Sequence, residues 1–302
     1  MKYEIIKSIV HNTFLPAFDI NILIDNCSNH YHENIIEEWN SRLSESNITH
    51  YTIEFKIGVH PFENSVKDGV VVNFTGSDTE ELFVENLKTQ PENWYYRHHE
   101  VKYTLNSLGY RTKQFDNIDW ENSIVMFGCS FVYGFGVTDE HTIPYFLEQL
   151  SGRPVINMGI GGSSIQTIFH NSIILNDSKY PTPKAVVTIL PTLSRYLKYE
   201  DICSQNYGFW NDISSKSLTS IDHVTNNILL IKTIRNLWKT KTYYYEYTWA
   251  RESTDLINKL DDSFCCGYLN TECRLARDLS HCGPETNLKL ATEIYENIKS
   301  NI

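Results

Sequence analysis

The stretch that decides the fold is residues 123–164, SIVMFGCSFVYGFGVTDEHTIPYFLEQLSGRPVINMGIGGSS. It opens with a short apolar run, 123–127, that is followed by glycine, and a second apolar run, 153–159, ends in glycine. Between them, 141–150 reads as a helix, with Pro144 suited to its first turn. A buried strand, a helix and another buried strand in succession predict two parallel strands.

The same alternation continues toward the C-terminus. Apolar runs predict three further strands, at 185–190, 243–249 and 263–269. Amphipathic spacing and capping residues predict helices at 163–175, where Ser163 or Ser164 is the cap, and at 221–238 and 285–298. Strands that are apolar throughout and alternate with helices predict an α/β fold, a parallel sheet covered on both faces. In such sheets functional residues gather at the carboxyl ends of the strands.

The chain before this sheet has a different pattern. Apolar runs and alternation predict strands at 17–24, 51–57 and 69–75, and helices are expected at 32–46 and 78–88. We therefore expect an additional N-terminal α+β region over residues 1–120, followed by a domain over residues 121–302.

Composition excludes several classes of protein. The 302 residues are 41% hydrophobic and 21% charged, which is ordinary for a globular chain. The formal net charge of −11 argues against nucleic acid as a partner. No apolar run approaches the ~20 residues that span a bilayer. The N-terminus shows no secretory signal, so we expect a cytoplasmic or non-classically exported protein.

Cysteine and histidine spacing does not suggest a metal site. The chain has seven Cys and no C-x-x-C pair, which predicts free thiols rather than a disulfide framework or a zinc site. His30 and His32, like His98 and His99, lack the spacing of a helical zinc motif and are expected to be solvated or packed.

Three places along the chain carry chemistry. Ser130 follows a buried strand and a glycine, so its hydroxyl stands at a sharp turn at the mouth of the sheet. The glycines within 157–164 let the backbone approach a ligand and aim N–H groups at an anion. Asp278 and His281 are three residues apart, and they can supply a general base and the carboxylate that orients it.

Each pattern alone has a plainer interpretation, as strand–helix turns or as a surface loop. A dinucleotide-binding loop at 159–164 fails because Ser164 stands where glycine is required. Together, a serine, a glycine turn, an aspartate and a histidine in this order on one sheet are more specific.

Residues 121–302 resemble the SGNH (GDSL-type) hydrolase superfamily. Residues 128–164 look like its first two blocks, and 276–294 (ARDLSHCGPETNLKLATEI) look like its last. The resemblance implies a flavodoxin-like three-layer fold, with Ser130 as nucleophile, His281 as base and Asp278 as its orienting carboxylate. It also implies an oxyanion hole that includes the N–H groups of Ser130 and Gly159, and neither a metal nor an organic cofactor.

The chain departs from the family pattern in two places. The first block reads Gly128-Cys129-Ser130 in place of G-D-S, and Cys129 is expected to be a small buried thiol. In the third block Leu193 stands where the family has an Asn that donates to the oxyanion. Thr192 and Asn157 are candidates to replace that donor, and so are Ser194 and Arg195. Residues 103–111 resemble a lead-in found in some members and are expected to pack beside the catalytic domain without a catalytic part.

These observations predict a serine esterase that hydrolyses a small acyl ester, with an O-acetyl group on a carbohydrate as the preferred substrate. The alternative is a module of this fold with little or no activity that binds a glycan or serves an assembly. A nucleotide-binding domain ranks far below both. The partner is then a small-molecule or glycan ester, and the oligomeric state stays open.

Overall fold

The computed structural model describes residues 70–200, 203–207, 221–250, 266–269 and 275–302. The strands predicted at 17–24 and 51–57 and the helix predicted at 32–46 lie outside these residues. By its internal contacts the chain divides into Met1–Phe55 and Lys56–Ile302, so every described residue belongs to the second unit. The boundary predicted near residue 120 falls inside that unit and stays a prediction.

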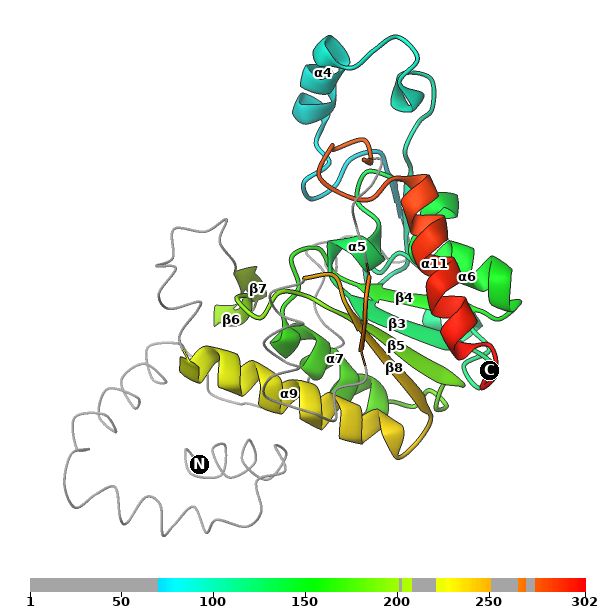
Figure 1. Ribbon diagram of the computed structural model, residues 1–302, viewed down its shortest axis with the longest axis vertical. Coiled ribbons are helices and arrows are strands. Elements are labelled where there is room, and N and C mark those ends of the chain that lie inside the picture. The colour runs from blue at the N-terminus through cyan, green and yellow to red at the C-terminus, as the bar shows by residue number, and fades with distance from the viewer. Residues whose placement is uncertain (1–69, 201–202, 208–220, 251–265, 270–274) are drawn as a thin grey trace, which may run out of the picture. The chain divides into compact units, whose positions relative to one another are not determined.

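Five parallel strands form the central sheet (Figure 1). Their spatial order is β4-β3-β5-β8-β9, which is the order 2-1-3-4-5 when the five strands are counted along the chain. This flavodoxin-like order confirms the predicted fold class. The strands are β3 (Ile124–Gly128), β4 (Val155–Gly159), β5 (Ala185–Leu190), β8 (Tyr243–Thr248) and β9 (Cys266–Tyr268).

Helices cover both faces of the sheet, as Figure 1 shows, and the central strands β3 and β5 are buried along their whole length. In β3, Val125 and Phe127 pack in one apolar cluster, and Ile124 and Met126 pack in the other. The helices of the first cluster are α7 (Ile165–Asp177) and α9 (Ile221–Lys239), and those of the second are α6 (Ile143–Ser151) and α11 (Pro284–Ile298). All four match predicted helices.

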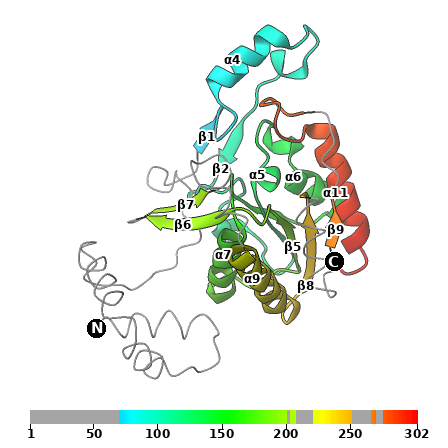
Figure 2. The same ribbon diagram turned by 60° about the vertical axis from the view of Figure 1, so that its left-hand side comes forward.

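Two short pairs of antiparallel strands accompany the sheet (Figure 2). β1 (Val70–Val72) pairs with β2 (Tyr103–Leu105), which shortens the predicted strand at 69–75. β6 (Tyr196–Glu200) pairs with β7 (Cys203–Tyr207), a hairpin that the sequence analysis did not predict. The predicted helix at 78–88 is α4 (Glu80–Thr89).

The remaining helical elements are short. They are the 3-10 turns η1 (Tyr95–Arg97), η2 (Phe115–Asn117) and η3 (Asp139–His141), and α5 (Ser130–Tyr133), which directly follows β3. Within the described ranges, no helix has the length and apolar composition needed to cross a bilayer.

Candidate active site

Ser130 stands at the carboxyl end of a central strand. β3 ends at Gly128, Cys129 is extended with φ −98° and ψ −151°, and Ser130 is the first residue of α5. The helix ends after one turn at Gly134, which takes a left-handed conformation with φ 85°. The Ser130 N–H donates no hydrogen bond to any described residue, as expected for the first turn of a helix. The predicted sharp turn is present, and its serine is 5% exposed.

Asp278 and His281 lie in a tight loop before α11. The loop is closed where the Ala276 N–H donates to the His281 carbonyl at 2.8 Å. His281 Nδ1 lies 2.6 Å from Asp278 Oδ2. The other carboxylate oxygen, Oδ1, accepts the N–H groups of Ser280 and His281, both at 3.1 Å. Because an ionised carboxylate only accepts, the proton of neutral His281 sits on Nδ1 and leaves Nε2 as the basic nitrogen.

The environment of Asp278 favours its charged form. Burial raises the pKa of this carboxyl. The opposing effects are larger in sum: the hydrogen bond and charge of His281, the Ser280 N–H and the Ser77 hydroxyl together hold the pKa below its ordinary value. Asp278 is therefore an anion at neutral pH, which suits a carboxylate that orients and stabilises an imidazolium.

The His281 ring lies beside the turn that carries the serine. Its centroid is 5.4 Å from the ring centroid of Phe131 and 5.4 Å from that of Phe135, both edge-to-face. No hydrogen bond joins Ser130 Oγ to His281 among the described contacts, and Ser130 Oγ instead faces Cys129 Sγ at 4.0 Å. The structure thus brings Asp278 and His281 together and sets Ser130 nearby with its contact to the base unmade. Such contacts often tighten only when substrate is bound.

The predicted oxyanion donors at the end of β4 are engaged inside the protein. The Gly159 N–H donates to Asn157 Oδ1 at 2.9 Å, and Asn157 Nδ2 donates to the Val132 carbonyl at 3.0 Å. The single N–H of Gly159 cannot bind an oxyanion without breaking its bond to Asn157, whereas the Asn157 amide uses one of its two N–H groups on Val132. Both assignments stay predictions. The next glycines, Gly161 and Gly162, have N–H groups that donate to no described residue.

Glycine at position 159 has a packing reason. A Cβ atom there would lie 2.4 Å from the Tyr133 backbone nitrogen, so only glycine lets β4 end this close to α5.

The loop after β5 holds the third-block residues. Thr192 Oγ1 accepts a hydrogen bond from the Ser194 hydroxyl at 3.1 Å, and Leu193 is buried. Arg195 Nη1 donates to the Ser163 carbonyl at 3.4 Å, and the guanidinium lies 5.6 Å from the Trp249 ring centroid. Arg195 therefore links this loop to residues 159–164, which we call the glycine loop. No described contact directs Thr192 to the serine, so its proposed role is untested.

Two histidines and two cysteines outside the Asp278 and His281 pair have ordinary surroundings. His98 Nε2 and His99 Nδ1 each contact a backbone carbonyl oxygen, and the thiols of Cys129 and Cys282 are buried. No cluster of three potential metal-ligating side chains is found among the described residues. His30 and His32 lie outside them.

Sequence reasoning missed three residues that contact the loop of Asp278 and His281. The Ser77 hydroxyl donates to Asp278 Oδ2 at 2.8 Å, across 201 positions of sequence. Asp78 pairs with Arg277 at 2.6 Å, and Asn86 Nδ2 donates to the Arg277 carbonyl at 3.0 Å. The sequence carries no signal for these contacts, because short polar residues in a turn have no periodicity and the partners are far apart along the chain.

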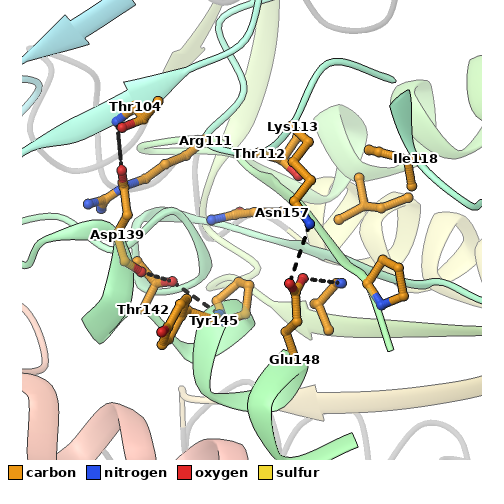
Figure 3. Close-up of a pocket in the computed structure, with 14 residues that line it drawn as sticks. Thr104, Arg111, Thr112, Lys113, Ile118, Asp139, Thr142, Tyr145, Glu148 and Asn157 are labelled. Carbon is orange, nitrogen blue, oxygen red and sulfur yellow. Dashed lines mark hydrogen bonds and ion pairs between the residues drawn. The ribbon is translucent and has the colours of Figure 1, made fainter. Parts of the chain in front are cut away.

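A cavity of about 330 Å³ lies along the edge strand β4 (Figure 3). No member of the Ser130, Asp278 and His281 set lines it. On its wall, Glu148 Oε2 accepts the Val155 N–H at 2.9 Å, and Lys113 Nζ lies 3.6 Å from Glu148 Oε1. Glu148 thereby caps an N–H group at the free edge of the sheet, which limits pairing with another strand.

Comparison with known proteins gives likenesses to solved structures. No family model matches the chain, and no curated protein matches it. A carbohydrate acetylesterase from Sinorhizobium meliloti is similar at 12% identity and a TM-score of 0.40, over 60% of this chain and all of that one. A member of the lipolytic protein G-D-S-L family from Veillonella parvula is similar at 13% identity and a TM-score of 0.40, over 60% of this chain and 99% of that one.

Proposed function

We propose that this chain is a serine esterase with Ser130 as nucleophile, His281 as general base and Asp278 as the carboxylate that orients it. The observation that carries the proposal is the 2.6 Å contact between His281 Nδ1 and Asp278 Oδ2. It stands beside the turn from β3 into α5, whose Phe131 and Phe135 rings flank the imidazole. An imidazole held by a buried carboxylate next to a serine at the start of a helix is the arrangement that acyl transfer needs.

In the proposed reaction, Ser130 Oγ attacks the ester carbonyl carbon while His281 Nε2 takes the hydroxyl proton. The tetrahedral intermediate collapses, its bond to the alkoxy oxygen breaks, and His281 returns the proton to the departing alcohol. A water molecule then attacks the acyl-enzyme with His281 again as base, which releases the acid and restores the serine. Backbone N–H groups of Ser130 and the glycine loop are the available donors for the oxyanion.

Enclosure of the site favours a small acyl group. Ser130 is 5% exposed, and the His281 side chain is 14% exposed. Aromatic rings close in on the imidazole from two sides. An acetyl group fits this restriction better than a long acyl chain, and the proposed substrate is an O-acetyl group on a carbohydrate.

A binding or assembly module is the second candidate function. Two observations favour it: no described hydrogen bond joins Ser130 to His281, and the predicted donors at Gly159 and Asn157 are both engaged. Such a protein would keep the fold and lose most of the activity.

Labelling with a fluorophosphonate probe separates the two functions. Wild type should be modified at Ser130, as read by peptide mass spectrometry, and His281→Ala should reduce the rate of modification at least about a hundredfold, because the hydroxyl then lacks its base. His98→Ala is the control, since the His98 ring contacts the Glu92 carbonyl and has no described hydrogen bond to Ser130, Asp278 or His281. Unlabelled wild-type protein is then assayed for release of acetate from acetylated sugars, with probe-treated protein as the inactivated control.

Absence of Ser130 modification at high probe excess would contradict the esterase proposal and favour the binding module. Equal labelling of wild type and His281→Ala would remove His281 from its role as base.

A further inference from the structure

A turn in the N-terminal segment reaches the catalytic carboxylate. Thr75 and Asp78 exchange backbone hydrogen bonds of 3.0 and 3.1 Å, and Gly76 between them has φ 59°. The turn lies between β1 and α4, far along the chain from Asp278. We call residues Thr75–Asp78 the clamp turn.

Each of its last three residues makes one contact in the region of the triad. Gly76 packs on Phe135, since a Cβ at this position would lie 2.2 Å from the ring. Ser77 donates to Asp278 Oδ2 at 2.8 Å. Asp78 accepts two hydrogen bonds from Arg277 Nε, at 2.9 and 3.2 Å, and another from Nη2 at 2.6 Å.

The clamp turn is held firmly enough to place a hydroxyl. The Arg277–Asp78 pair is buried, with side-chain exposures of 4% and 1%. The Tyr103 hydroxyl donates to Asp78 and accepts the Gly136 N–H at 2.8 Å. The Gly136 carbonyl in turn accepts the Arg277 N–H at 2.9 Å. Asp78 in the clamp turn and Arg277, the residue before Asp278, are thus joined both directly and through Tyr103 and Gly136.

We propose that Ser77 is a positioning residue for the triad: its hydroxyl fixes the rotation of the Asp278 carboxylate so that Oδ2 faces His281 Nδ1. This inference rests on the proposed esterase function. Oδ2 receives two donors, Ser77 and His281, and Oδ1 receives two backbone N–H groups. Without the Ser77 hydroxyl, the imidazole is the one donor left on Oδ2. The two backbone N–H groups bind Oδ1 and do not by themselves fix the direction of Oδ2.

Other charged and titratable groups surround the carboxylate and stay in place when Ser77 is changed. They are His281, the paired Arg277 and Asp78, and the buried phenol of Tyr96, whose pKa is raised by burial and by neighbouring charges including Asp278. A change at Ser77 therefore alters one hydrogen bond to Asp278 and no charge.

The test compares Ser77→Ala, which deletes the donor, with Ser77→Thr, which keeps it. Ser107→Ala is the matched control, because the Ser107 hydroxyl also donates to a side-chain oxygen in the same segment, that of Gln114 at 2.8 Å. Each protein is measured for kcat and KM on an acetyl ester across pH, for its unfolding midpoint in urea, and by proton NMR for the His281 Nδ1–H resonance, which His281→Ala assigns.

We expect Ser77→Ala to lower kcat about three- to tenfold with little change in KM, as for loss of one hydrogen bond to a charged group that water partly replaces. The acidic limb of the pH profile should move to higher pH, because the Ser77 hydroxyl is one of the groups that hold the pKa of the Asp278 carboxyl below its ordinary value. The Nδ1–H resonance should shift and broaden. Ser77→Thr should resemble wild type in all three measurements, and Ser107→Ala should leave them unchanged.

The proposal is overturned where Ser77→Ala matches Ser107→Ala in pH profile and NMR resonance, or where Ser77→Thr is as impaired as Ser77→Ala. A fall in unfolding midpoint with an unchanged resonance would assign Ser77 to folding only and also overturn it. A wild-type protein that neither hydrolyses esters nor reacts with the phosphonate probe would fail the proposed function. The NMR comparison would then still decide whether Ser77 positions Asp278.

Discussion

At Asp278, four hydrogen-bond donors converge on one carboxylate, from His281, Ser77 and two backbone N–H groups. This coordination offsets the cost of burying the charge, which is why the pKa stays below its ordinary value although burial raises it. The charge of Asp278 therefore depends on the number of hydrogen-bond donors that the fold supplies, which the residue types of the loop alone do not reveal. A charged, fixed Asp278 is what the proposed general base requires.

Asp278→Asn should lower kcat about 10³- to 10⁴-fold with a small change in KM, because the amide no longer enforces the tautomer with the proton on Nδ1. Steady-state kinetics on an acetyl ester measure this. Asp119→Asn is the control, since Asp119 is bonded only to an exposed Asn122 in the described contacts. A loss below about tenfold would contradict the orienting role of Asp278.

The Asp278→Asn variant should also change how the free energy of unfolding depends on pH. The unfolded carboxyl has a pKa of about 3.9 and the folded one lies below it, so the stabilisation from the charged form is complete above the unfolded value and is lost as pH falls through the folded value. The difference in free energy of unfolding between wild type and Asp278→Asn should therefore be largest above about pH 5 and narrow toward pH 2 to 3. Urea unfolding at several pH values checks this.

At the scale of elements, the two strand–helix turns build the site. α7 begins at a capping box, in which the Ser164 hydroxyl accepts the Thr167 N–H at 3.3 Å and Thr167 Oγ1 accepts the Ser164 N–H at 3.4 Å. Of the two caps expected from sequence, Ser164 is the one used. Ser163 instead donates to the Gly128 carbonyl at 2.9 Å, which ties the glycine loop to the end of β3.

Ser164→Ala should destabilise the protein by about 1 kcal/mol, the usual cost of losing an N-cap. Ser178→Ala is the control at the other end of α7, where the hydroxyl donates to the Leu175 carbonyl at 2.7 Å and its loss should cost only a few tenths. Urea unfolding of both variants compares the two ends. Equal effects would show that capping does not set the start of this helix.

At the scale of the whole described unit, two buried arginines link the N-terminal segment to the residues around the end of α5 and to the loop of Asp278. Arg111 donates to the carbonyls of Tyr133, Gly134 and Val137, around the end of α5, and pairs with Asp139 at 2.5 Å. Arg277 pairs with Asp78 in the clamp turn. Residues 70–113 are thus bound to the residues around the end of α5 and to Arg277. This agrees with the expectation that 103–111 packs beside the domain over residues 121–302.

Asp78→Ala should destabilise the protein by about 3–5 kcal/mol, because it leaves the Arg277 guanidinium buried without its partner. Removing both charges, with Asp78→Leu and Arg277→Met, should recover much of this loss, since apolar groups of similar volume often replace a buried pair at little cost. Unfolding in urea measures both. If the free energy of unfolding of Asp78→Ala lies within about 1 kcal/mol of the wild-type value, the ion pair contributes little to folding.

The sequence by itself determined the sheet, its helices and the pair Asp278 and His281, because these depend on local information. Apolar runs of five or six residues that end in glycine or turn residues favour buried strands, caps act within one turn, and two residues three apart in a loop can meet through local geometry. Only the tertiary structure decided that Ser77 and Asp78 reach the catalytic loop, that Gly159 turns its N–H to Asn157, and that β6 and β7 form a hairpin. The contacts of Ser77 and Asp78 depend on the packing of segments up to 201 positions apart, and no periodicity in the sequence records that packing.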